Sequence, residues 1–250
     1  MSKGYLAVSQ RKYRAIQDFK KRLLSSPAKN SVAKIILFGS LRKGKARPES
    51  DVDLLVFATN FLEEMREACL DASLEINIDL GESVEPLVYS IDSLRHPNSY
   101  FLYCNIKNGK EIYTMEEEKL RREEAIAYLE LAQEYEKSAR DCSSRGHYRL
   151  AVDGAYNAVE LCAKGFLILK LKDLPTSHGG IVGKFGEIYV RSGILSKEMG
   201  REFNRGLWLR NQARYERHTN IGKKESEAML ELVGKFINAL DKELYADIPF

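Results

Sequence analysis

The pattern of hydrophobic and polar positions changes once along this chain, near residue 117. Before that point, short apolar runs of strand length alternate with stretches whose apolar residues recur every three or four positions. After it, only the helical period remains. The pattern predicts an α+β protein, in which a small mixed-sheet domain at residues 1–117 is followed by an all-α antiparallel helical bundle at residues 118–250.

The first domain is expected to begin with an amphipathic helix at residues 9–24 that packs behind a buried strand at residues 32–38. A second buried strand starts at Asp51. Asn60 is the expected N-cap of a following helix at residues 61–76. Residues 84–90 are predicted to form a third strand, and Pro86 indicates that this strand lies at a sheet edge.

The Asn108-Gly109 pair predicts a tight turn before a last short strand at residues 111–113. The second domain is expected to contain only helices, joined by short connections that favour antiparallel neighbours. A loop is expected at residues 175–180. The helices are predicted at residues 119–144, 147–171, 181–191, 197–219 and 224–245.

Composition excludes several classes of protein. The net charge of +3 over 250 residues is too mild to indicate nucleic-acid binding by overall charge. The four cysteines show no Cys-x-x-Cys spacing, which argues against a zinc site and against a disulfide framework. No apolar run approaches the roughly 20 residues that span a bilayer. With no signal peptide, the chain is expected to be cytoplasmic and not to contact membranes.

Two carboxylates open the second strand. Side chains alternate across a strand, so Asp51 and Asp53 project from one face while Val52 projects from the other. Holding two like charges this close is unfavourable unless a cation lies between them. Oxygen ligands of this kind suit Mg²⁺, which is usually shared with substrate phosphates. The pair therefore predicts a magnesium site.

A glycine-serine turn follows the first strand and supplies the complementary chemistry. Gly39 lacks the Cβ that would keep a phosphate away, and Ser40 offers a hydroxyl and a backbone N–H. Arg42 and Lys43 come next, and together with Lys45 and Arg47 they carry enough positive charge to hold a triphosphate. We therefore expect Gly39, Ser40, Arg42 and Lys43 to bind a nucleotide.

Gly39-Ser40, ten residues, and then Asp51-Val52-Asp53 resembles the signature of the DNA polymerase β-type nucleotidyltransferase superfamily in its minimal form. The resemblance implies a Mg²⁺-dependent enzyme that transfers a nucleoside monophosphate, expected to be AMP from ATP, to an acceptor hydroxyl. It also implies a third catalytic carboxylate on the neighbouring strand, which completes the metal site and can take a proton. Glu85 is the candidate, and Asp79 is the alternative.

The second domain resembles a HEPN domain at residues 148–162, in the loop at residues 176–178 and at residues 209–215. Catalytic HEPN ribonucleases carry an Arg, a polar residue and then a His that is separated from the Arg by four to six residues. Arg210-Asn211 matches the beginning of this motif, but Tyr215 holds the first permitted place and His218 comes one residue late. On the expected helix, Arg210, Arg214 and His218 share one basic stripe.

The two resemblances together suggest a toxin–antitoxin-like protein, dimeric through the helical domain. The stripe would pack against a second copy or bind a phosphate-bearing ligand such as RNA. Tyr215 is a candidate for modification with AMP. Three alternatives stay open: a nucleotide- or RNA-binding regulatory module without turnover, a HEPN ribonuclease regulated by the nucleotidyltransferase domain, and an antibiotic-type nucleotidyltransferase.

Overall fold

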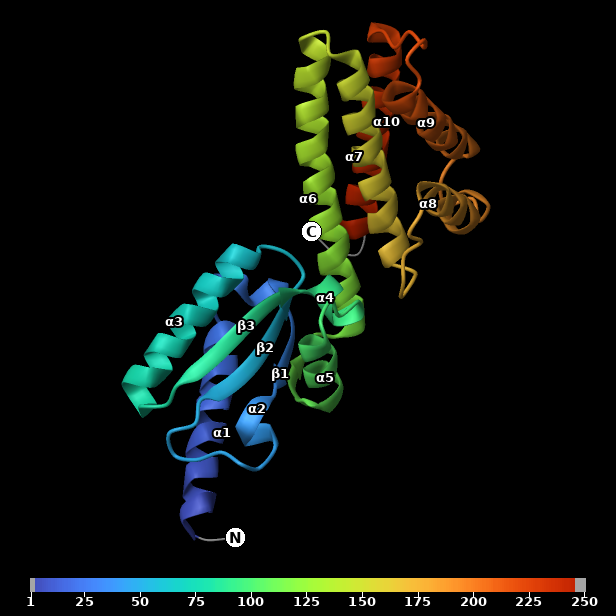
Figure 1. The fold of residues 1–250 in the computed structure, drawn as a ribbon. Coiled ribbons are helices and arrows are strands. Elements are labelled where there is room, and N and C mark those ends of the chain that lie inside the picture. Colours follow the sequence, from blue (N-terminus) through green and yellow to red (C-terminus); the bar gives the residue numbers. More distant parts are fainter. Residues whose placement is uncertain (1–2, 246–250) are drawn as a thin grey trace. The chain divides into compact units, whose positions relative to one another are not determined.

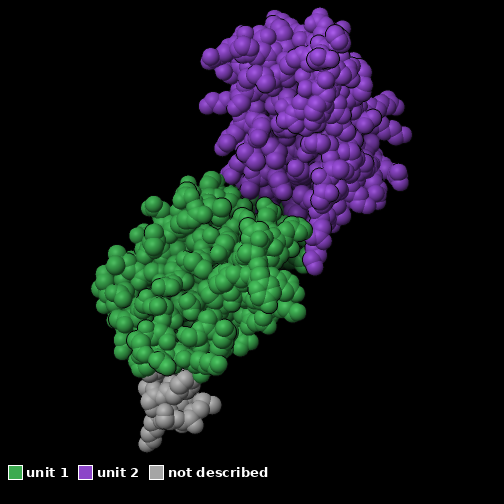
Figure 2. Space-filling view, viewed as in Figure 1, with its two compact units in different colours: residues 1–123 green, residues 124–250 purple. Residues whose placement is uncertain are grey.

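The computed structural model describes residues 3–245 of the chain, with side chains from residue 10 onward. The chain separates into two compact units, residues 1–123 and residues 124–250 (Figure 2). A small mixed sheet lies in the first unit and only helices follow it, so the predicted fold class is confirmed (Figure 1). The expected domain boundary coincides with the start of α6 (Glu117–Ser144), and this helix continues into the second unit.

The first unit is built on a sheet with the strand order β3-β2-β1-β4. The central strand β1 (Val32–Leu37) pairs antiparallel with β2 (Val52–Ala58) and with β4 (Lys110–Thr114). β3 (Val84–Ser90) pairs parallel with β2. The edge position that Pro86 indicated for β3 is confirmed.

The two faces of this sheet have separate apolar cores, because successive side chains of a strand alternate between faces. On one face, Leu54 and Val56 pack with residues of α1 (Lys3–Leu23) and α3 (Leu62–Leu80). On the other face, Leu55 and Phe57 pack with residues of α4 (Ile91–Arg95) and α5 (Tyr100–Asn108). The alternation places Asp53 on the second face, together with α4 and α5.

The start of α3 differs from its expectation. Phe61, with φ 49°, takes the N-cap position that was predicted for Asn60. The Asn60 side chain instead accepts a hydrogen bond from Ser31 Oγ at 2.5 Å, which ties the end of β2 to η1 (Pro27–Ser31). The Asn60 amide therefore bonds to Ser31, which is distant in the sequence, and does not cap α3 as local capping rules predict.

Helices α4 and α5 are missing from the sequence prediction. Their segment alternates turn residues with aromatics, which obscures the helical period. The tight turn expected at Asn108-Gly109 is also wrong, because Asn108 ends α5 and the Gly109 N–H donates to the Asn105 carbonyl at 2.9 Å. The short strand β4 that follows is confirmed.

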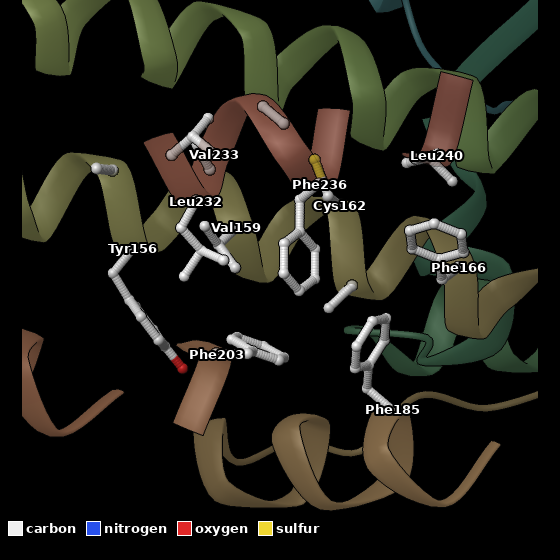
Figure 3. Close-up of a cluster of buried hydrophobic side chains, with 14 of the residues drawn as sticks. Tyr156, Val159, Cys162, Phe166, Phe185, Phe203, Leu232, Val233, Phe236 and Leu240 are labelled. Atoms are coloured by element: carbon white, nitrogen blue, oxygen red, sulfur yellow. The ribbon is translucent and has the colours of Figure 1, made fainter. Parts of the chain in front are cut away.

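The second unit is a helical bundle around α7 (Tyr148–Ile168). It contains α6 from residue 124 on, and the helices after α7 are α8 (His178–Phe185), the π-helical η2 (Gly186–Val190), α9 (Lys197–Tyr215) and α10 (Lys223–Tyr245). Figure 3 shows how aromatic and aliphatic side chains from α7, α8, α9 and α10 meet in the core. α8 begins inside the expected loop. In residues 3–245, no helix has the length and apolar character that a membrane span needs.

Helix α9 ends four residues before its expected end. The guanidinium of Arg149, on α7, donates hydrogen bonds to carbonyls in and after the last turn of α9. This long-range cap uses carbonyls that a continuing helix would need for itself. The acceptors are Gln212 at 3.2 Å, Ala213 at 2.8 Å, Glu216 at 2.9 Å, and Thr219.

Replacing this cap is expected to loosen the end of α9. We predict that Arg149→Met lowers the free energy of unfolding by about 2 kcal/mol, because several charge-assisted hydrogen bonds are lost from a half-buried position. Amide hydrogen exchange at residues 216–220 should become faster. Arg145→Met, which removes an exposed pair with Asp141, is the matched control and should change neither quantity. Equal stability of the two variants would contradict the role of Arg149.

Candidate functional site

Gly39 and Asp53 lie in direct contact where the β1–β2 connection begins. The Phe38 N–H donates to the Asp53 carbonyl at 3.1 Å, so the glycine turn starts beside the aspartate. Gly39 has φ +70°, and a Cβ at this position would lie 1.8 Å from Asp53 Oδ2. Glycine is therefore required twice, by the backbone conformation and by the approach of the carboxylate.

Asp51 directly precedes β2 and Asp53 is its second residue, and both side chains are half-buried. Burial raises the pKa of Asp53, and the charge of Asp51 adds to this rise. A hydrogen bond from the Ser40 backbone and the charge of Lys43 act in the opposite direction. Two neighbouring carboxylates form a donor set that a hard divalent cation stabilises, with waters and phosphate oxygens as the remaining ligands.

The two candidates for a third carboxylate lie in different places. Glu85 is paired in register with Asp53 on the neighbouring parallel strand, so both side chains point to one face, where Glu85 is exposed. Asp79 lies on α3 and forms an ion pair with Arg22 at 2.5 Å, so it is not brought to the aspartate pair. Within the described residues, no three acidic, His or Cys side chains are already gathered as a metal site.

A pocket of about 350 Å³ opens beside the Gly39 turn. One wall comes from the end of β1 and from α2 (Gly39–Arg42), and the other comes from the end of α5. Its lining carries three cationic side chains, which suits a triphosphate. The lining residues are Phe38, Gly39, Arg42, Lys43, Asn105, Lys107, Asn108 and Gly109. Sequence reasoning missed the α5 wall because it did not predict that helix.

A buried lysine forms hydrogen bonds next to the aspartate pair. Lys12, on α1, is 1% exposed, and its ammonium donates to Glu82 Oε2 at 2.8 Å and to the Ser50 carbonyl. Ser50 directly precedes Asp51, and Glu82 lies shortly before β3. Arg11 also pairs with Glu82 at 2.9 Å. Lys12 thus holds together the segments that lead into β2 and β3, next to Asp51 and Glu85.

Removing this lysine should destabilise the first unit. We predict that Lys12→Met lowers the free energy of unfolding by about 3 kcal/mol, because Glu82 stays buried with only the more exposed Arg11 as a partner. The exposed Lys21, on the same helix, provides the control Lys21→Met. Chemical denaturation measures both. If Lys12→Met/Glu82→Leu is no more stable than Lys12→Met, the buried pair is not the cause.

The HEPN-like residues of α9 are only partly brought together. Arg210 is 4% exposed, its Nε lies 3.4 Å from Asp153 Oδ1, and it donates to Asn211 Oδ1 at 3.0 Å. Arg214 reaches the same Asp153 at 3.2 Å. The expectation that His218 shares their stripe is wrong, because α9 ends at Tyr215 and His218 lies exposed in the following turn.

The Tyr156 ring lies near both Arg210 and a different histidine, His178. The Arg210 guanidinium lies 5.9 Å from the centroid of the Tyr156 ring, and that ring meets His178 edge-on at 6.0 Å. His178 Nδ1 forms a hydrogen bond with Glu160. Burial alone would raise the pKa of Glu160, but this bond and the charge of Lys164 hold it below its usual value. Sequence reasoning missed Tyr156 and Glu160, although both lie on the Asp153 face of α7.

Tyr215 is the last residue of α9 and is 68% exposed. Its ring centroid lies 5.9 Å from the Arg210 guanidinium. The hydroxyl is therefore accessible, as its interpretation as an AMP acceptor requires. That interpretation stays a prediction.

Two family models match the chain. The model of the nucleotidyltransferase domain matches residues 16–137, and the model of the HEPN domain matches residues 125–244. They cover the two units in the order that the sequence resemblance implied.

Relatives occur in Methanocaldococcus jannaschii. The chain is 30% identical over 123 residues to "Putative toxin MJ0605". The aligned residues make up 49% of this chain and 90% of that protein. It is 26% identical over 116 residues to "Putative toxin MJ0142", which covers 46% and 78%. A crystal structure of a spectinomycin adenyltransferase from Enterococcus faecialis, with ATP and spectinomycin, aligns with 92% of this chain and 99% of its own at 15% identity. The TM-score of 0.32 is too low to indicate a shared overall arrangement.

Proposed function

The chain belongs to the family that joins a nucleotidyltransferase domain to a HEPN domain, and we propose that it transfers AMP from ATP to an acceptor hydroxyl in a magnesium-dependent reaction. The observation that carries this proposal is the contact between the Gly39 turn and the Asp53 carboxylate, at the edge of a pocket with three cationic side chains. A phosphate chain and a divalent cation need these two features side by side.

Each residue of the site has a role in this reaction. Asp51 and Asp53 would hold Mg²⁺, which when bound neutralises phosphate charge and polarises the reacting phosphate. The backbone at Gly39 and Ser40 orients the phosphates, and Arg42 and Lys43 balance their charge. Glu85 is proposed to accept the proton of the attacking hydroxyl. Catalysis then comes mainly from positioning and charge neutralisation.

Metal and nucleotide dependence test the proposal together. Pyrophosphate release should be fastest with ATP among the four NTPs. It should need Mg²⁺ and fall to background when EDTA removes the metal. Readdition of Mg²⁺ should restore it. Release that is unaffected by EDTA, or the absence of release with every NTP and acceptor, would contradict the proposal.

The proposal includes a toxin–antitoxin-like arrangement, in which the first domain restrains the HEPN domain and two copies pair through the bundle. The relatives named as toxins support it. Sedimentation equilibrium should give twice the chain mass of 28.5 kDa.

In growing bacteria, full-length Asp53→Asn should arrest growth where the wild type does not, and adding Arg210→Ala should remove the arrest. Equal growth of wild type and Asp53→Asn would contradict the restraint.

A further inference from the structure

A row of exposed side chains on α5 leads away from the nucleotide pocket. Tyr100 is 83% exposed and Tyr103 is 50% exposed. With Lys107 they occupy positions i, i+3 and i+7 of the helix, so the three share one face. Lys107 also lines the pocket. The row, which we name the α5 platform (Tyr100, Tyr103 and Lys107), therefore begins at the pocket and extends about 10 Å along the helix.

Two side-chain contacts hold this platform beside the reaction site. The Lys107 ammonium lies 5.7 Å from the centroid of the Tyr103 ring. Phe101, the neighbour of Tyr100, packs edge-to-face on Phe38 with ring centroids 5.6 Å apart. Phe38 directly precedes Gly39. The start of α5 is thus fixed to the strand end that carries the phosphate-binding turn.

The chemistry of the platform favours a nucleic acid. Two exposed tyrosine rings, about 4.5 Å apart along the helix axis, can each stack on a base. Lys107 offers a cation for the backbone at the end of the row nearest the pocket. A duplex cannot use such rings, because its bases already stack on one another, whereas a single strand can.

We propose that the α5 platform binds the 3′ end of a single-stranded RNA, and that this RNA is the acceptor of the transferred nucleotide. This inference rests on the proposed function and deepens it by naming the acceptor. The two last bases stack on Tyr100 and Tyr103, and the adjoining phosphate lies against Lys107. The terminal ribose then enters the site beside Asp53.

The reaction balances without a further reactant. The terminal ribose oxygen forms a bond to the α-phosphorus of ATP, and the bond from that phosphorus to the oxygen bridging to the β-phosphorus breaks. Pyrophosphate leaves with the bonding electron pair. The hydroxyl proton passes to Glu85 and from there to solvent. The RNA grows by one nucleotide.

Fluorescence polarisation with an end-labelled eight-nucleotide single-stranded RNA tests the platform. Tyr100→Ala/Tyr103→Ala should raise Kd by at least about tenfold, since each ring stacks one base. Tyr100→Phe/Tyr103→Phe keeps both rings and should bind like the wild type. Tyr135→Ala, at an exposed tyrosine on α6, is the matched control and should have no effect. An unchanged Kd in the double alanine variant, or a Phe variant as weak as the Ala variant, would overturn the proposal.

A labelling arm separates failure of this inference from failure of the proposed function. With α-labelled ATP, the full chain should place label on the RNA, and the double alanine variant should do so at least about tenfold less efficiently. Label on Tyr215 instead of RNA overturns the acceptor but leaves the transferase intact. If no acceptor elicits pyrophosphate release, the proposed function fails, and the polarisation arm alone then decides whether the platform binds RNA.

Discussion

Asp53→Asn is expected to lower nucleotidyl transfer by at least ~1000-fold while the chain stays folded. The substitution keeps the shape of the side chain and the place it fills against Gly39. It removes the charge that would hold a metal ion together with Asp51. Because burial and Asp51 both raise the pKa of Asp53, removing this charge relieves an unfavourable contact. The melting temperature should therefore not fall.

Asp79→Asn is the matched control for this variant. It also removes one negative charge from the first unit. The Asp79 side chain is exposed and forms an ion pair with Arg22 on α1. Transfer rates should stay within about twofold of the wild type, since exposed ion pairs contribute little. Steady-state rates of pyrophosphate release measure all three proteins. If Asp53→Asn retained activity, or if Asp79→Asn lost it, the metal site would be assigned to the wrong carboxylates.

Gly39→Ala is expected to have the second-largest effect, with loss of nucleotide binding as well as of turnover. The added Cβ would lie 1.8 Å from Asp53 Oδ2, so either the carboxylate or the turn must move away. The positive φ adds about 1–2 kcal/mol of backbone strain. We expect the Kd for ATP, measured by calorimetry with the metal present, to rise by at least about tenfold.

Gly146 provides a control that distinguishes the effect of backbone strain from the effect of the contact with Asp53. Gly146 has φ +79°, close to that of Gly39, but a Cβ there would meet nothing within 4 Å. Gly146→Ala should therefore lose a similar amount of stability while binding ATP like the wild type. Equal ATP affinity in both variants would show that the approach of the Gly39 turn to Asp53 is not needed for nucleotide binding.

The strands and the aspartate pair could be predicted because local sequence determines them. Apolar runs of strand length form β1 and β2, and β2 begins at Val52, so Asp53 lies at its start and Asp51 directly precedes it. For Gly39 the sequence predicted that the missing Cβ leaves room for a phosphate, whereas its contact with the Asp53 carboxylate is visible only in the structure.

The remaining parts depend on residues far away in the sequence. Arg149 ends α9 through carbonyls more than 60 positions along the chain, so a local helical pattern could not show that His218 leaves the Arg210 stripe. The contacts of Tyr156 with His178 and with Arg210 likewise need α7 packed against α8 and α9. Lys12 has the sequence appearance of a surface lysine, and only the positions of Glu82 and Ser50 explain its burial.

The most direct test of the central claim asks which phosphorus of ATP is attacked. The protein is incubated with Mg²⁺, single-stranded RNA and ATP labelled at either the α- or the γ-position. We predict that α-label becomes covalently attached to the acceptor while γ-label leaves as pyrophosphate, and that both depend on Asp53. Transfer of γ-label to the acceptor, or release of γ-label as inorganic phosphate, would show a phosphoryl-transfer or hydrolytic reaction and contradict nucleotidyl transfer.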